Sequence, residues 1–334
     1  MPSPPKESKK DPVARPREPA RALRTVAIIG AGRLGTVLGR ALMKAGYEIK
    51  VAVARRPAHA QRAARAIGPK VIPLAAKDLR QITSEQLKIF DSIDLFLITT
   101  PDDQIGAVSE GLSALLRHST RSNSKPNLDK TILHSSGALS SEILAPLRKA
   151  GFSTGSLHPL VSISDPLGNP EIFVGVFFCL EGDSRALRTA ERIVHRLGGH
   201  SFTLQGRMKP LYHAAAVTTS GHVVALFDIA LEMLSHCGLK SRKAQRILLP
   251  LLQSTLKNLA SKVPAKALTG TFARADVATA RRHLAALHSE RLKDALSAYL
   301  LLGRRSAELA RKAGAGKENL AAIRKLLPSP ARNR

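Results

Sequence analysis

The run TVAIIGAGRLG, residues 25–35, decides the fold of this chain. It begins with small and β-branched residues typical of a buried strand, and three glycines follow at Gly30, Gly32 and Gly35. Gly30 permits a tight turn, Gly32 lets a pyrophosphate approach the backbone, and Gly35 lets the next helix pack closely on the sheet. Because the glycines follow a strand and open a helix, the run predicts a dinucleotide-binding βαβ unit.

The helix that follows, RLGTVLGRALMKAG, starts at Arg33 and Leu34, inside the glycine loop. The first turn of a helix carries free N–H groups and the positive end of the helix dipole, which attract phosphates. We therefore predict that Arg33 and Leu34 contact the dinucleotide, with the Arg33 guanidinium as an extra cation. The alternative is a glycine-rich turn in a Rossmann-like domain that has lost its ligand.

The second strand ends in VAVARRP, residues 51–57, where an NAD-binding site carries a carboxylate for the ribose 2′-OH. That acid is missing here, and Arg55 and Arg56 stand in its place. Arginine offers a 2′-phosphate a fork of charge-assisted donors. The pair predicts NADP(H) as the cofactor rather than NAD(H). The alternative is that both are surface arginines at a helix start.

Beyond this unit, strands and helices alternate along the chain. Apolar runs predict further strands, and amphipathic runs between them predict helices. The strands are expected at 49–55, 70–75, 94–101, 130–136, 153–160 and 173–182, and the helices at 57–68, 104–118 and 184–199. This alternation predicts an α/β fold with a Rossmann-like, doubly wound parallel sheet over residues 25–207. Residues 1–24 are rich in proline and charge, which predicts a disordered basic tail; a targeting or nucleic-acid-binding arm is the alternative.

Two of the predicted strands end in residues that should face one crevice, because ligands of open α/β sheets bind at the carboxyl ends of the strands. One strand ends at Thr100 and Pro101, and the other ends in the run Ser135, Ser136 and Gly137. We expect these five residues to contact the nicotinamide or the substrate.

Other readings stay open for the polar residues near these strand ends. Ser136 and Ser140 are equally compatible with plain helix caps. His134 and His158 each end a predicted strand, where a histidine could polarise a carbonyl or simply make a structural hydrogen bond.

From residue 208 the pattern becomes helical, and residues 208–328 predict an all-α domain. Its first helix is expected to run unbroken from Lys209 to Cys237, and a later helix should be kinked by Pro250. Lys209, His213 and Ser220 fall on one stripe of the first helix, since residues three or four apart share a face. A cation, an imidazole and a hydroxyl on one stripe predict a catalytic role; the alternative for Lys209 is a solvated lysine.

Seven motifs occur in order over residues 25–283: GAGRLG, LHSSGALS, GSLHPLVS, FCLEGD, KPLYHAAA, LLPLLQSTLKNL and ALTGTFARAD. Together they resemble a bacterial two-domain family in which a Rossmann-like oxidoreductase domain precedes a helical domain of unknown function. That family is similar to 3-hydroxyisobutyrate and 6-phosphogluconate dehydrogenases, pyrroline-5-carboxylate reductase, ketopantoate reductase and the deazaflavin-dependent NADP oxidoreductases.

The resemblance implies a helical domain like the C-terminal domain of 6-phosphogluconate dehydrogenase. It also implies a role for Lys209, which matches by position the general acid/base lysine of the hydroxyacid dehydrogenases. His213 stands where those enzymes carry an asparagine.

These features predict an NADP-dependent oxidoreductase that transfers hydride between NADPH and a carbonyl or imine of a small substrate, expected to be anionic. Lys209 would protonate or stabilise the developing oxyanion, while His213 and Ser220 would orient the substrate. Thr269, Gly270 and Arg274 are candidates to complete the site. The rival hypotheses are a non-catalytic NADP-binding sensor or regulator and a basic nucleic-acid-binding protein.

The net charge of +27 is uneven, since residues 239–334 hold 21 Lys or Arg against 5 Asp or Glu. A solvated surface, an anionic ligand and nucleic acid all suit such charge, but three tyrosines and no tryptophan disfavour nucleic acid, which needs stacking platforms. Two distant cysteines, Cys179 and Cys237, argue against a disulfide framework or a metal site and favour the cytoplasm.

No apolar run approaches the roughly 20 residues of a membrane span, so none is expected. The first helix of the second domain is apolar nearly all round, and such a helix must be covered on every side. A homodimer built on the helical domains is therefore predicted.

Overall fold

The computed structural model describes residues 25–80, 82–122 and 130–328, and it divides into two compact units, Met1–Ala216 and Val217–Arg334. The predicted tail, residues 1–24, lies outside the described residues. The predicted boundary at residue 207 precedes the division between the two units.

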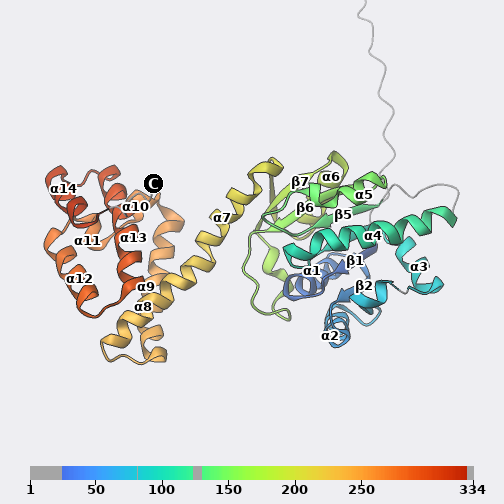
Figure 1. The fold of residues 1–334 in the computed structure, drawn as a ribbon, viewed down its shortest axis with the longest axis horizontal. Helices are drawn as coiled ribbons and strands as arrows, with labels where there is room; N and C mark the ends of the chain where they lie inside the picture. Colours follow the sequence, from blue (N-terminus) through green and yellow to red (C-terminus); the bar gives the residue numbers. More distant parts are fainter. Residues whose placement is uncertain (1–24, 81, 123–129, 329–334) are drawn as a thin grey trace, which may run out of the picture. The chain divides into compact units, whose positions relative to one another are not determined.

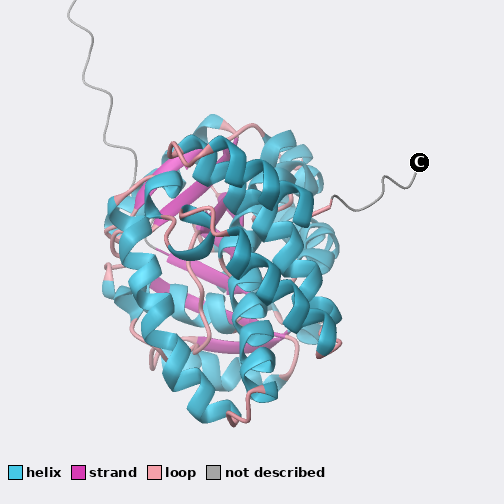
Figure 2. Cartoon of the chain, turned by 90° about the vertical axis from the view of Figure 1, so that its left-hand side faces the viewer, coloured by secondary structure: helices cyan, strands magenta, loops and turns pink. Residues whose placement is uncertain are grey.

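Eight strands of the first unit form one sheet (Figure 1). They are β1 (Thr25–Ile29), β2 (Glu48–Ala54), β3 (Ile72–Ala75), β4 (Leu95–Ile98), β5 (Thr131–His134), β6 (Ser153–Pro159), β7 (Phe177–Gly182) and β8 (His200–Thr203). Their order is β3-β2-β1-β4-β5-β6-β7-β8, and every neighbouring pair is parallel except β6 and β7. Figure 2 shows the strands of the sheet twisted relative to one another. The Rossmann-like sheet is confirmed, with one reversed pair that the sequence did not signal.

Helices cover both faces of this sheet, as a doubly wound fold requires. They are α1 (Arg33–Lys44), α2 (Pro57–Ile67), α3 (Ser84–Asp91), α4 (Asp102–Ser122), α5 (Ala145–Lys149) and α6 (Ser184–Arg196). Helix α7 (Lys209–Thr219) follows β8, and Lys209 is its only buried residue. Alternate residues of β1 enter two different cores. Val26 and Ile28 pack with α1, α2 and α6, whereas Ala27 and Ile29 pack with α3, α4 and α5.

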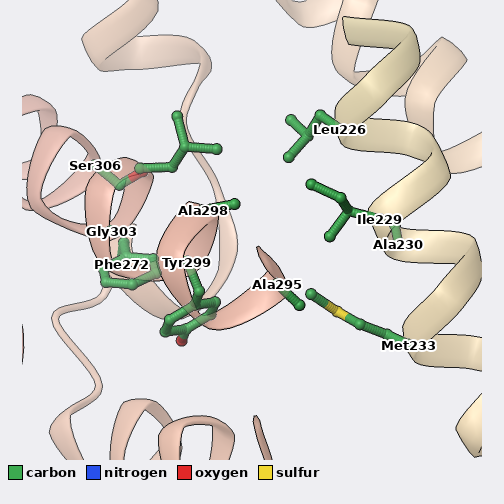
Figure 3. Close-up of a pocket in the computed structure, with 11 residues that line it drawn as sticks. Leu226, Ile229, Ala230, Met233, Phe272, Ala295, Ala298, Tyr299, Gly303 and Ser306 are labelled. Carbon is green, nitrogen blue, oxygen red and sulfur yellow. The ribbon is translucent and has the colours of Figure 1, made fainter. Parts of the chain in front are cut away.

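The second unit is helical throughout its described residues, which confirms the predicted all-α domain. Its helices are α8 (Gly221–His236), α9 (Ser241–Ser261), α10 (Pro264–Ala267), α11 (Gly270–Ala273), α12 (Val277–Ser289), α13 (Lys293–Lys312) and α14 (Lys317–Leu326). Figure 3 shows Leu226, Ile229 and Met233 of α8 facing Phe272 and Tyr299 across an apolar pocket of about 170 Å³.

One helix differs from expectation. The helix predicted as one run from Lys209 to Cys237 is interrupted at Ser220, where φ and ψ are −121° and −81°, and it continues as α8. The interruption falls at Ser220 and Gly221, and serine and glycine are both weaker helix formers than the three alanines that come earlier in the helix. Helix α9 continues through Pro250 as a single helix of 21 residues, and the kink expected at Pro250 stays a prediction.

The stretch Gly206–His236 is long enough to cross a membrane and contains an 18-residue window with a mean hydropathy of 1.5, although the sequence predicted no span. Length and composition also fit an apolar helix that is covered by another protein surface. The two cysteines differ in exposure: Cys179 is buried in β7, and Cys237 is exposed at the end of α8.

Candidate functional site

The glycine loop between β1 and α1 has the geometry that the sequence predicts. Gly30 has a φ of +107°, and a Cβ there would lie 2.6 Å from Thr100 N. A Cβ on Gly35 would lie 2.5 Å from Gly30 O, so only glycine lets α1 approach the sheet this closely. Gly32 differs, because a Cβ there would meet only Gly30 O, at 3.9 Å. The space beside Gly32 is therefore open, as a pyrophosphate requires.

The first turn of α1 directs backbone N–H groups toward this space. Gly32 is the N-cap residue, and no side chain caps the helix. The amides at Arg33 and Leu34 therefore lack the intrahelical acceptors that later residues have. A pyrophosphate would supply those acceptors, so the residues present fit a dinucleotide.

Arg55 and Arg56 follow β2 directly, and both are exposed. Strand β2 neighbours β1, and Val53 O accepts hydrogen bonds from Gly30 N at 2.9 Å and Ala31 N at 2.7 Å. The two arginines therefore leave the sheet beside the glycine loop. Neither guanidinium forms an ion pair with any described residue. Both remain available to a 2′-phosphate.

The loop after β5 is held by the Ser136 hydroxyl. Its oxygen accepts hydrogen bonds from Ala138 N at 3.1 Å and Leu139 N at 2.9 Å, and it donates to Asp102 Oδ2 at 2.8 Å. Ser136 thus caps a turn, as one of its two expected roles required. Ser140 precedes the next helical turn but makes no side-chain cap.

Gly137 lies directly against two imidazoles. A Cβ at this residue would lie 2.4 Å from His213 Nδ1 and 2.8 Å from His158 Nε2. The two rings meet edge to face, with centroids 5.4 Å apart. Nδ1 of His213 is buried and has no hydrogen-bond partner among the described residues. A polar atom of a ligand is one partner that would satisfy it.

His158 makes its own polar contact on the opposite side of the ring. Its Nδ1 lies 2.7 Å from the phenol oxygen of Tyr212, and the Cys179 thiol is a further hydrogen-bond partner of that phenol. Burial raises the pKa of Tyr212 and of Cys179. Burial, with His213 and Lys209 adding repulsion, lowers the pKa of His158 to about 4. His158 is therefore neutral near pH 7.

Lys209 is fully buried at the start of α7. Its Nζ donates to Ser136 O at 2.9 Å and to Ser156 Oγ at 2.7 Å. Burial lowers the pKa of this ammonium group, while Cys179, Glu181 and Asp102 oppose that shift. The expected alternative of a solvated lysine does not hold. Lys209 instead joins the β5 loop to β6 from within the unit.

His134, at the end of β5, is also buried, and its Nδ1 accepts a hydrogen bond from Ser136 N at 3.2 Å. Burial first, and then repulsion by Lys209, lowers the pKa of His134 to about 3. Of the two roles expected for His134, the structure supports the structural hydrogen bond.

A pocket of about 420 Å³ opens at this end of the first unit. Its lining brings together six of the predicted residues with two that were not assigned to the site: Arg33, Leu34, Ser135, Ser136, Gly137 and His213, with Asp102 and His158. Val161 and Ile163, from the segment after β6, supply an apolar wall. The Lys209 ammonium group is not part of this lining.

Other predicted residues lie elsewhere. The backbone of Thr100 supports Gly30, and its buried hydroxyl has no partner among the described residues. Pro101 is exposed and precedes α4. Ser220, Thr269, Gly270 and Arg274 belong to the second unit.

Sequence reasoning missed Tyr212, Ser156 and the hydrogen bonds of Cys179. A signal was present: Ser156 and His158 share one face of β6 by the alternation of a strand, and Lys209 and Tyr212 are one turn apart on α7. Two polar residues two apart in a buried strand indicate a polar partner, although not which one.

Comparison with known proteins gives two family matches. Residues 8–159 match the model of a Rossmann-like domain, and residues 176–306 match that of a domain of unknown function, DUF2520. These matches confirm the resemblance inferred from the motifs. The comparison with curated proteins gave no match.

Several solved structures share the fold. Protein TM1727 from Thermotoga maritima aligns with a TM-score of 0.63 and 22% identity, over 86% of this chain and 99% of its own. BF3122 from Bacteroides fragilis, a proposed NADP oxidoreductase, aligns with a TM-score of 0.65 and 18% identity, over 86% of this chain and 98% of its own. An imine reductase from Myxococcus stipitatus, solved with NADP⁺, aligns with a TM-score of 0.56 and 18% identity, over 91% of this chain and 100% of its own. At these identities the likeness shows the fold alone.

Proposed function

Because the chain combines a Rossmann-like domain with a C-terminal DUF2520 domain, we propose that it is an NADP-dependent oxidoreductase acting on a carbonyl or imine of a small substrate. The observation that carries this proposal is the pocket that joins the first turn of α1 to the β5 loop and the two imidazoles. It puts a dinucleotide cradle beside polar groups suited to a reacting substrate.

The cofactor would be held at three places. Gly30, Gly32 and Gly35, with the amides of Arg33 and Leu34, would hold the pyrophosphate. Arg55 and Arg56 would bind the 2′-phosphate, with Arg33 as a third cation. The loops at Thr100–Pro101 and Ser135–Gly137 would flank the nicotinamide.

When bound, NADPH supplies a hydride. The residues of the chain would orient the acceptor and stabilise the charge that develops on its oxygen or nitrogen. His213 would contact the substrate through its unpartnered Nδ1, and Arg33 would attract an anionic group. We assign Lys209 to the site as a charge behind the β5 loop, and Ser220 remains a candidate for orienting the substrate.

A cofactor titration tests the proposal. Calorimetry should show that NADPH binds much more tightly than NADH, and the double variant R55A/R56A should lose most of that preference. Each charge-assisted bond contributes about 1.5–3 kcal/mol, so tenfold or greater loss is expected for each arginine that contacts phosphate. The variant R62A/R65A removes the same charge from α2, the helix that follows the two arginines, and should keep the preference. Equal affinity for NADPH and NADH in the parent protein contradicts the proposal.

Turnover is the second test, followed by NADPH absorbance against a panel of 2-oxo acids, aldehydes and cyclic imines. Oxidation of NADPH that depends on one of these compounds supports the enzyme. Tight NADPH binding with no turnover of any carbonyl or imine supports the rival, a non-catalytic NADP sensor. The buried position of Lys209, outside the pocket lining, is the observation that favours that rival.

A further inference from the structure

His158 has one ring nitrogen in a hydrogen bond and the other directed toward the pocket. Nδ1 is 2.7 Å from the Tyr212 phenol oxygen. Cε1 and Nε2 lie on the opposite side of the ring, next to Gly137 in the pocket lining. The chemistry that His158 offers to a ligand therefore depends on which nitrogen carries the proton.

The phenol of Tyr212 sets the position of that proton. Burial keeps both the Tyr212 phenol and the Cys179 thiol protonated, since it raises the pKa of each. We place the phenol proton in the 2.7 Å contact with His158 Nδ1, which is then the acceptor. His158 Nε2 then carries the imidazole proton and presents an N–H donor to the pocket.

The charges around His158 oppose its protonation. Lys209 places a buried ammonium group behind the β5 loop, and His213 packs edge to face on the ring. The groups that face this cluster are Lys209, Tyr212 and His213 from α7, Cys179 and Glu181 from β7, His134 from β5 and Asp102 from α4. Burial dominates, and the pKa of His158 is lowered to about 4.

Lys209 itself is poorly placed to touch a substrate. Two of its three N–H groups are used by Ser136 O and Ser156 Oγ, and the side chain is 0% exposed. Reaching a ligand would require the ammonium group to leave both acceptors. Its position suits a fixed charge that acts on a neighbour.

We propose that His158 is the catalytic residue of this site, a neutral imidazole that donates a hydrogen bond from Nε2 to the reacting oxygen or nitrogen of the substrate. Tyr212 and Lys209 are positioning residues, because Tyr212 fixes the tautomer and Lys209 adds its repulsion to the burial and to the His213 repulsion that keep the ring uncharged. This inference rests on the proposed oxidoreductase function and names the electrophile that the function needs.

The step balances as follows for a carbonyl. The acceptor carbon takes the hydride that NADPH supplies, the π electron pair moves to oxygen, and NADP⁺ remains. The Nε2–H group stabilises the negative charge on that oxygen, and a neutral imidazole is an effective electrophile for this purpose. The His158 proton stays on Nε2, and the oxygen takes its proton from solvent in the open pocket.

Nuclear magnetic resonance tests the tautomer and charge without any substrate. In protein with ¹⁵N-labelled histidine, saturated with NADP⁺, His158 should show the Nε2–H tautomer and a pKa near 4. The variant Y212F should lose the single tautomer, and K209M should raise the pKa of His158, because it removes one of the two repulsions that act beside burial. An Nδ1–H tautomer in the parent protein, or no pKa change in K209M, overturns the proposal.

A matched control separates this effect from simple loss of a buried lysine. Lys130 is also buried, and its Nζ donates to Asp91 O and Ile93 O, not to any residue of the pocket. K130M should therefore lower stability but leave the His158 pKa and tautomer unchanged. If K130M shifts the His158 pKa as much as K209M does, Lys209 is not acting as a local charge.

Turnover provides the catalytic test with the 2-oxo acid, aldehyde and imine panel. H158A should lower kcat about 10²–10³-fold, as loss of an oxyanion donor does, with NADPH affinity unchanged. K209M should shift the acid limb of the pH profile upward. Parent-like kcat in H158A overturns the catalytic role even when NADPH binds. Loss of NADPH binding in the parent protein would instead reject the proposed function.

Discussion

Gly137 sets the distance between the β5 loop and the two imidazoles of the pocket. The atoms that a Cβ would meet belong to two imidazole rings, and one of these rings is hydrogen-bonded to Tyr212, so both must move to admit an alanine. We therefore expect G137A to lower the free energy of unfolding by about 1–3 kcal/mol, as overpacking does, while displacing His158 and His213. Urea unfolding and the histidine ring resonances measure the two effects.

The control for this variant is G111A. Gly111 is exposed in α4, and a Cβ there would meet nothing within 4 Å. Alanine should stabilise the helix by up to about 1 kcal/mol and leave the histidine resonances in place. Identical ring resonances in G137A and the parent protein would show that Gly137 does not set the position of the rings.

Two neutral histidines, buried His134 and half-buried His158, make the first unit sensitive to acid. The pKa of His134 is lowered to about 3 and that of His158 to about 4, from 6.5 in the unfolded chain. Between these values the unfolded chain binds more protons, so the free energy of unfolding falls as pH drops below 6.5 and keeps falling toward about 4. Urea titrations from neutral pH to about pH 5 should record this slope, and H134Q should make it shallower. The same slope in H134Q would exclude His134 as a cause.

At the scale of elements, α9 offers a direct stability test. Pro250 lies inside this helix, where it removes a backbone donor and crowds the preceding turn, and its side chain is exposed. P250A should therefore stabilise the second unit, by as much as about 3 kcal/mol. Thermal unfolding should show a higher Tm for P250A and little change for Q253A, an exposed position on the same helix. A lower Tm in P250A would mean that the ring makes contacts worth more than the hydrogen bond.

The sequence predicts the βαβ start of the fold well, because its evidence is local. Gly30, Gly32 and Gly35 each have a steric reason that needs no distant residue beyond the neighbouring strand. The direction of β7 was not predictable in this way, since an apolar run reads the same in both directions. Strand β8, with the sequence HSFT, is short and polar and carries no apolar signal.

The burial of Lys209 could likewise not be predicted from the helical pattern. Periodicity places Lys209 and His213 on one stripe but does not say whether that stripe meets solvent, a pocket or a strand. The partners Ser136 and Ser156 are more than fifty residues away in the chain, and their contact depends on how α7 docks on the sheet. Functional residues that act through such contacts are therefore the ones that sequence reasoning places least well.

For the whole molecule, exposed apolar side chains on α8 and α9 predict a homodimer. Val224 is 71% exposed and Leu251 is 64% exposed, and further exposed residues on these helices are Leu226, Ile247, Leu249, Leu256 and Leu259. Covering such a surface stabilises association by roughly 25 cal/mol per Å² of apolar area, before the cost of association. Light scattering should report a dimer at micromolar concentration.

The variant V224E/L251E should shift that dimer toward monomer, because each carboxylate would be buried without a partner. L167E is the control, since Leu167 is a comparably exposed apolar residue of the first unit, at 62%. A monomeric parent protein would leave this apolar surface to a different partner.

The unequal exposure of the two cysteines gives each chain one natural attachment point for a nitroxide spin label. Cys237 is accessible to a thiol-reactive reagent, whereas Cys179 is shielded beneath Tyr212. No residue of the pocket needs to be replaced before labelling. In a homodimer the two labels would form a single pair, and their dipolar coupling would report one distance between the ends of the two α8 helices. Recording that distance with and without NADPH would show whether the α8 helices of the two subunits move when the cofactor binds.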